Sequence, residues 1–126
     1  MKDPIRASFR RYVRLPCQVV REHDFKLVGD LALDLSSQGM LVRASQRMLT
    51  GDEVIVAFKL PRSTQWFDAQ GIVSRVLHGR RPNDYAGLAF GIQFLNLSSD
   101  DQYRLFDSLR GLAAPDAARP PRSLAA

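Results

Sequence analysis

The sequence predicts a mostly β domain, a small sandwich or barrel of short strands with one helix near its C-terminus. Several segments alternate apolar and polar residues with the period of two that is typical of half-buried strands. Turn-forming Gly, Pro, Asn and Asp residues separate these segments. Only the region after Ser99 carries apolar residues at helical spacing. With 126 residues, the chain is long enough for a single core that needs no disulfide.

Six segments are expected to form strands, namely 16–21, 31–36, 40–43, 54–60, 66–77 and 88–94. A turn is expected at His23-Asp24, and a turn-rich loop at 79–84. Within 31–36, three leucines at alternate positions would face the core, which leaves Asp34 and Ser36 on the opposite face. Gly71 lies inside the longest strand and is a candidate β-bulge, because glycine within a strand often marks one.

Ser99 is expected to be the N-cap of the helix. Ser99 and Gln102 have the spacing of a capping box. The acidic residues 100–101 would lie in the first turn, where their negative charge interacts favourably with the positive end of the helix dipole. Gly111 would help to end the helix. The apolar face, expected to pack across the barrel, consists of Leu105, Phe106, Leu109 and Leu112.

Charge and composition divide the chain into three parts. Residues 1–14 carry five basic residues against Asp3 alone, so most of the net charge of +5 lies in this segment. We interpret 1–14 as a flexible basic arm, 15–112 as the barrel with its helix, and 113–126 as a disordered tail rich in Ala, Pro and Arg. A basic arm on a nearly neutral body indicates a local anion site more than general attraction to nucleic acid or membranes.

Other classes of protein fit the sequence poorly. A single cysteine, Cys17, allows no internal disulfide and suits a reducing compartment; a buried structural thiol is its default interpretation. No apolar run approaches the roughly 18 residues that span a bilayer, and no signal-peptide h-region is present, so we expect a cytoplasmic protein without membrane insertion. The sequence has neither a nucleophile elbow nor a Walker loop, and its two histidines are isolated, so we predict no enzyme, cofactor or metal site.

Arg10 and Arg14 are the first candidate ligand-binding residues. Their separation of four places both side chains on one face of either a strand or a helix. Arginine presents a flat cation with a fork of donors, which suits phosphate pairing, stacking on a base and the O6/N7 edge of guanine. Arg11 would point elsewhere on a strand but could still reach a phosphate. Arg6 and Arg10 have the same spacing, but we prefer Arg10 and Arg14 because the first strand begins directly afterwards.

Asp34, Ser36 and Gly39 are the second candidate group. A carboxylate can accept hydrogen bonds from the N1–H and N2–H₂ edge of guanine or hold an arginine, and a serine both donates and accepts. Gly39 would permit a turn with positive φ and leave room for a ligand. The same pattern also occurs as ordinary turn chemistry between strands. Together with the arm, however, these residues meet the needs of an anionic guanine dinucleotide.

These residues carry a resemblance to the PilZ family. Arg10 and Arg14 occupy the arginine positions of an Arg-x-x-x-Arg entry motif, and Asp34-x-Ser36-x-x-Gly39 resembles the family's Asp/Asn-x-Ser-x-x-Gly motif. The segments 70–76 and 90–94 and the Leu/Phe helix are similar to later elements of the family, so the resemblance covers about 6–112.

The resemblance implies a six-stranded antiparallel β-barrel with a C-terminal helix and cyclic di-GMP bound outside the barrel. By the same resemblance, the mobile arm closes over the ligand, with Arg10 and Arg14 on bases and phosphates and Asp34, Ser36 and Gly39 on the other wall. Arg11 is a further candidate contact, and the ligand could be one molecule or a stacked pair. We expect a cyclic di-GMP receptor that signals to an unidentified downstream protein.

Two alternatives stay open at this point. One is a PilZ-fold adaptor that binds only proteins; it would be favoured by loss of the two motifs, which are both intact. The other is a small nucleic-acid-binding barrel, which would need basic and aromatic residues across a strand face. The strands are nearly neutral, so we expect no nucleic-acid polymer as a partner.

Overall fold

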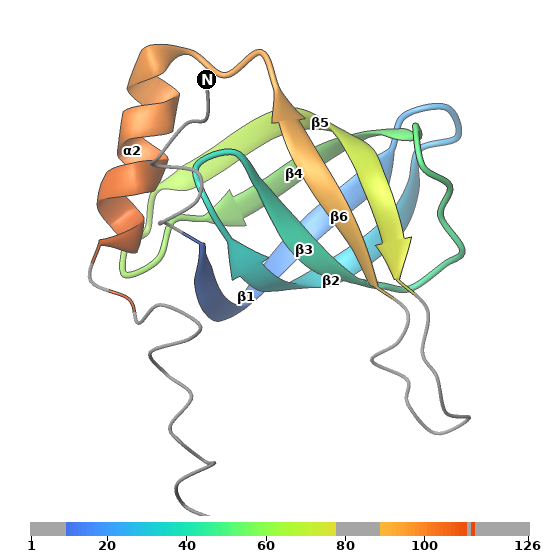
Figure 1. The fold of residues 1–126 in the computed structure, drawn as a ribbon, viewed down its shortest axis with the longest axis horizontal. Helices are drawn as coiled ribbons and strands as arrows, with labels where there is room; N and C mark the ends of the chain where they lie inside the picture. Colours follow the sequence, from blue (N-terminus) through green and yellow to red (C-terminus); the bar gives the residue numbers. More distant parts are fainter. Residues whose placement is uncertain (1–9, 78–88, 111, 113–126) are drawn as a thin grey trace, which may run out of the picture.

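The computed structural model describes residues 10–77, 89–110 and 112. Six antiparallel strands form a closed barrel in the order β1-β2-β3-β6-β5-β4, and one helix, α2, lies beside one end of it (Figure 1). The elements are β1 (Arg11–Arg21), β2 (Lys26–Leu35), β3 (Gly39–Ala44), β4 (Glu53–Lys59), β5 (Trp66–Leu77), β6 (Ala89–Leu95) and α2 (Ser99–Leu109). The pairing of β1 with β4, from Cys17 opposite Phe58 to Arg21 opposite Val54, closes the barrel. The fold class expected from the sequence is therefore confirmed.

The barrel interior is filled by aliphatic and aromatic side chains from every strand and from α2. Phe58 and Phe67 pack with their ring centroids 5.3 Å apart, and Phe67 lies 6.2 Å from Phe94. The large side chains that are almost fully buried are Val19, Val28, Leu35, Val42, Val54, Val56, Phe58, Phe67, Val73, Phe90, Leu105 and Leu109. Cys17 is buried among them, as expected for a structural thiol. Burial of this apolar surface is the main stabilising contribution to such a barrel.

Helix α2 docks on the barrel through Leu105 and Leu109, which belong to the core. Arg104 adds a second attachment: one guanidinium nitrogen donates a 3.3 Å hydrogen bond to the carbonyl oxygen of Trp66, and the group lies 5.5 Å from the Phe67 ring centroid. The expected cap at Ser99 is wrong by one residue. Ser98 has the extended backbone of an N-cap, and its hydroxyl accepts a 3.1 Å hydrogen bond from the N–H of Asp101.

The first strand begins earlier than expected. β1 starts at Arg11 and pairs with β2 from its first residues, with Arg11 opposite Leu35 and Tyr12 opposite Asp34. Arg11 and Arg14 are therefore strand residues, and the boundary expected after residue 14 lies inside β1. The predicted loop 79–84, Leu88, Gly111 and the tail 113–126 lie outside the described residues.

The simple alternation expected for 31–36 is also wrong. Ala32 and Leu35 are fully buried, whereas Leu31 and Leu33 are only half-buried. The cause is a change of register: β2 advances two residues, from Ala32 to Asp34, while β3 advances one, from Val42 to Leu41. A bulge of this kind inserts one extra residue and changes the phase of the side chains that follow it.

Gly71 is not the bulge that the sequence suggested. It pairs regularly with Val54 on β4 and with Phe94 on β6. A β-carbon at this position would overlap a methyl group of Ile92, so Gly71 serves close packing. The irregularity of β5 lies three residues further on, where the pairing with β6 shifts between Val73 and Arg75.

Candidate functional site: a polar cavity on the outer surface of the barrel

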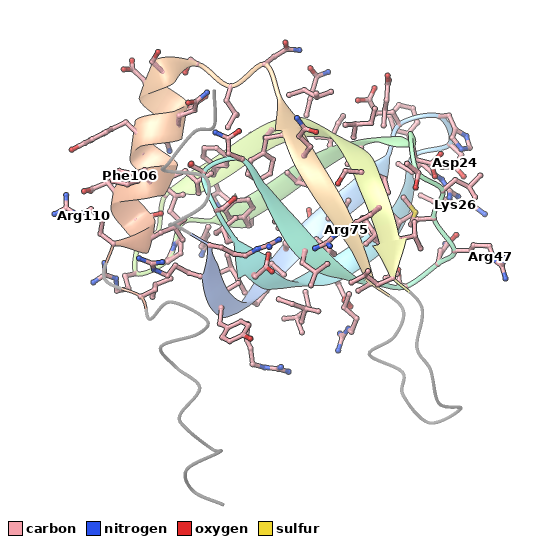
Figure 2. All side chains as sticks on the ribbon, in the orientation of Figure 1. Asp24, Lys26, Arg47, Arg75, Phe106 and Arg110 are labelled. Carbon is pink, nitrogen blue, oxygen red and sulfur yellow. The ribbon has the colours of Figure 1, made fainter. Side chains whose placement is uncertain are left out.

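A polar cavity of about 270 Å³ lies on the barrel surface beside the β2–β3 turn. It is lined by Arg10, Ser36, Gln38, Gly39, Met40, Ser74, Arg75, Gly91, Ile92 and Gln93. The turn, β5 and β6 therefore each contribute to its wall. Figure 2 shows Arg75, one of the lining residues, over the face of the barrel to which β6 contributes.

Ser36 shapes the turn at the edge of this cavity. Its hydroxyl oxygen accepts hydrogen bonds from the N–H groups of Gln38 at 3.1 Å and Gly39 at 3.2 Å, and lies 3.3 Å from the carbonyl oxygen of Gly39. The Ser36 N–H donates to that same carbonyl oxygen at 2.9 Å. This is the local backbone bonding that serine provides in turns. Ser36 therefore fixes the backbone of the cavity wall.

Asp34 is the carboxylate of the site, and it is held from two sides. One oxygen accepts a 3.1 Å hydrogen bond from the N–H of Leu41 on β3, and the other lies 3.3 Å from Nε of Arg10. Burial raises the pKa of the Asp34 carboxyl, while Arg10, the Leu41 N–H and Arg75 act in the opposite direction. Only the Asp34 side of this ion pair is shielded from water, because the Arg10 side chain remains half exposed, and solvent therefore weakens the attraction.

Gly39 has a different role from the one expected. Its backbone does not have positive φ; among the described glycines, only Gly51 does. Instead, a β-carbon on Gly39 would overlap the carbonyl oxygen of Ile92 on β6. Gly39 is therefore needed because β3 and β6 approach closely at the start of their pairing, where Gly39 lies opposite Gln93.

The three candidate arginines differ in position. Arg10 pairs with Asp34, lines the cavity and keeps a side chain that is 51% exposed. Arg11 is half-buried at the start of β1, and one of its guanidinium nitrogens donates to the carbonyl oxygen of Arg10 at 3.3 Å. Arg14 is exposed on the same face of β1 as Tyr12 and is not among the residues that line the cavity. The structure thus brings Arg10, Ser36 and Gly39 together in the cavity wall and joins Asp34 to Arg10 by the ion pair, whereas neither Asp34 nor Arg14 is among the lining residues.

Sequence reasoning missed the side of the cavity that β5 and β6 form. Ser74 and Arg75 of β5 and Gln93 of β6 line it, together with Gln38 of the turn. A signal was available, because Ser74 and Arg75 are two successive polar residues between the apolar pairs Ile72-Val73 and Val76-Leu77 of this strand. Two polar neighbours in such a strand are typical of a bulge.

The cavity offers charge-assisted hydrogen bonding from Arg10 and Arg75 and several amide and hydroxyl groups. The Asp34 carboxylate is not among its lining residues and adjoins it through the ion pair with Arg10. This is the chemistry needed to hold an anionic ligand that also carries hydrogen-bond donors. Within the described ranges, no group of three or more His, Cys, Asp or Glu side chains is arranged to hold a metal ion. Among those same residues, no helix is long and apolar enough to cross a membrane.

Comparison with known protein families identifies the family to which this chain belongs. The family model for the PilZ domain matches residues 4–111, most of the chain. The chain belongs to the PilZ family. The resemblance seen in the two sequence motifs is therefore confirmed at the level of the whole domain.

Solved PilZ structures share the fold at low sequence identity. The PilZ domain of YcgR from Escherichia coli, solved with c-di-GMP, is 16% identical with a TM-score of 0.65, covering 85% of this chain and 90% of that one. The PilZ domain of CeSA from a cellulose-synthesizing bacterium is 16% identical with a TM-score of 0.58, covering 82% and 97%.

A third similar structure is the Bacillus subtilis inhibitor of motility, MotI/DgrA. It is 16% identical with a TM-score of 0.66, and the match covers 86% of this chain. The present chain spans about half of that protein, since only 51% of it is covered. No curated protein matches the chain.

Proposed function

We propose that this PilZ domain is a cytoplasmic receptor for cyclic di-GMP that transmits ligand binding to a downstream protein. The observation that carries the proposal is the pairing of Arg10 with Asp34 at a polar cavity. These residues come from the two halves of the motif, and the barrel places them in contact. Two of the similar structures fit this function, because YcgR is solved with c-di-GMP and MotI is an inhibitor of motility.

The chemistry of the cavity supports a guanine dinucleotide. The Asp34 carboxylate can accept hydrogen bonds from the N1–H and N2–H₂ edge of a guanine, while Arg10 can pair with a phosphate or with the O6/N7 edge. Charge-assisted hydrogen bonds of this kind contribute about 1.5–3 kcal/mol each. A few of them, minus the cost of ordering the ligand and the chain, are enough for affinity on the order of micromolar.

Closure of the N-terminal segment is part of the proposal. Arg10 is tied to the barrel by its ion pair with Asp34, yet half of its side chain remains exposed. The residues that precede it include Lys2 and Arg6, which a ligand with two phosphates would attract. Closure over the ligand would create a new surface for a partner protein, and this change of surface would transmit the signal.

Isothermal titration calorimetry with cyclic di-GMP tests the proposal. Wild-type protein should release or absorb heat and saturate, and Arg10→Ala and Asp34→Ala should each weaken binding by about tenfold to a hundredfold. Arg14→Ala tests the second arginine of the motif, which would contact the ligand from the outer face of β1. Arg47→Ala is the matched control, because Arg47 is exposed and does not line the cavity. Absence of binding by the wild type at high micromolar concentration would overturn the proposal.

A further inference from the structure

The bulge of β5 places two successive side chains on the outer surface. Val73 pairs with Ile92 and Arg75 pairs with Gly91, so Ser74 is the extra residue between the two pairs. Both Ser74 and Arg75 are exposed, whereas Val73 is buried in the core. A bulge of this type redirects a side chain without breaking the sheet. Here it turns Arg75 toward the polar cavity.

Gly91 provides the surface on which Arg75 lies. A β-carbon at position 91 would be 3.3 Å from both Cγ and Nε of Arg75 and 3.5 Å from the Ser74 hydroxyl. Because two atoms at different points along the side chain are equally close, the arginine runs across Gly91 along the barrel wall. Any side chain at position 91 would compete with the arginine for this place. The absence of a side chain at Gly91 therefore lets the guanidinium rest against the floor of the cavity.

Arg75 also differs from the other arginine of the cavity in its interactions. Arg10 is engaged with the Asp34 carboxylate, but none of the ion pairs formed among the described residues includes Arg75. Arg75 is nevertheless near enough to Asp34 to favour its charged form electrostatically. A planar cation thus lines the same cavity as Arg10, the partner of the Asp34 carboxylate.

We propose that Arg75 is a ligand-binding residue whose guanidinium stacks on a guanine base held by Asp34. The inference rests on the proposed function and extends it, since the two sequence motifs do not include β5. Arginine suits this role because its guanidinium is flat, weakly hydrated and able to stack on an aromatic ring. The arrangement makes the floor of the cavity selective for planar purine rings and not only for negative charge.

Titration calorimetry with cyclic di-GMP on the full chain separates the possible results. Arg75→Ala should raise the Kd by about tenfold, the effect typical of losing one stacked base. Arg75→Lys should stay nearly as weak, because it keeps the charge and loses the plane. Gly91→Ala should weaken binding slightly, although it changes no charge, because its methyl group would lie 3.3 Å from Cγ and Nε of Arg75 and would shift the arginine by a few tenths of an ångström. Arg47→Ala, which removes the same charge elsewhere, should bind like the wild type.

Each result supports or overturns the assignment. Wild-type affinity in Arg75→Ala, with the wild type binding normally, would overturn the role of Arg75 and leave the proposed function intact. Full affinity in Arg75→Lys would overturn stacking and show that charge alone suffices. If the wild type itself does not bind, the proposed function and this inference fall together. Thermal melting of each variant identifies any loss of fold, and Arg75→Gln supplies a second, uncharged replacement of similar length.

Discussion

The Asp34 carboxylate accepts a 3.1 Å hydrogen bond from the backbone N–H of Leu41 on the neighbouring strand. This bond crosses from β2 to β3 at the point where their register shifts, between Ala32 and Asp34. It positions the carboxylate without help from the N-terminal segment, so that the ion pair with Arg10 adds to an acceptor that is already in place. The fixed part of the candidate site is therefore built into the sheet.

The burial of Asp34 predicts a conflict between stability and binding. Its folded-state pKa is raised above the ordinary value of 3.8, mainly by burial, so the folded state binds the proton more tightly than the unfolded chain does. Stabilisation from this group is complete below the unfolded pKa and is lost as pH rises through the folded pKa. Asp34→Asn should therefore melt at a temperature equal to or above that of the wild type at pH 7, while its ligand binding falls.

Melting curves across pH check this expectation. The stability advantage of Asp34→Asn should shrink as the pH approaches 3, because the wild-type carboxyl is then neutral as well. A variant that is less stable than the wild type at pH 7 would show that attraction to Arg10 outweighs the burial of the charge. Asp30→Asn is a suitable control, because Asp30 is an exposed carboxylate on the same strand.

Gly39 predicts a large effect of a very small substitution. Gly39→Ala should lower the free energy of unfolding by about 1–3 kcal/mol, because the new methyl group meets the rigid backbone carbonyl of Ile92. Gly91→Ala is the matched control, since its methyl group meets only the flexible side chains of Ser74 and Arg75. Urea denaturation of both variants measures the difference. Equal stabilities would contradict the close approach of β3 and β6.

The position of the helix cap can be tested with two neighbouring serines. Ser98→Ala should reduce stability by about 1 kcal/mol, because it removes the hydroxyl that accepts from the Asp101 N–H. Ser99→Ala should have a much smaller effect, because Ser99 is the first residue inside α2. Chemical denaturation of the two variants gives the comparison. A larger loss in Ser99→Ala would restore the cap that the sequence suggested.

Cys17 should be unreactive in the folded protein. Burial is the main reason that the pKa of its thiol rises from 9.0 to about 12, with a further contribution from Asp30. Very little thiolate, the reactive form, is therefore present at pH 8. Ellman's reagent should label Cys17 only slowly in buffer and rapidly in denaturant. Fast labelling of the native protein would place the thiol at the surface.

The sequence was informative where local patterns dominate. Alternation in 54–60 identified β4, whose Val54, Val56 and Phe58 are all fully buried, and the expected bounds of β5 are those observed. Leu105 and Leu109 of the predicted helix are in the core. The predictions were wrong where tertiary pairing overrides periodicity. The bulge after Ala32 moves Leu33 away from the core face of the strand. Gly71 is required for close packing against Ile92 and does not mark a bulge.

The PilZ fold and one half of the candidate site could thus be read from the chain itself. Side-chain period, turn residues and the two motifs are local properties, and they identified Arg10, Asp34, Ser36 and Gly39 as neighbours. The other half was decided only by tertiary structure. Arg75 is distant in sequence from both motifs. It reaches the cavity because β5 pairs with β6 and shifts register at Ser74, and because its side chain passes over Gly91, which has no side chain of its own. Strand pairing and register depend on the whole barrel, and for that reason no local pattern could place Arg75 in the same cavity as Arg10.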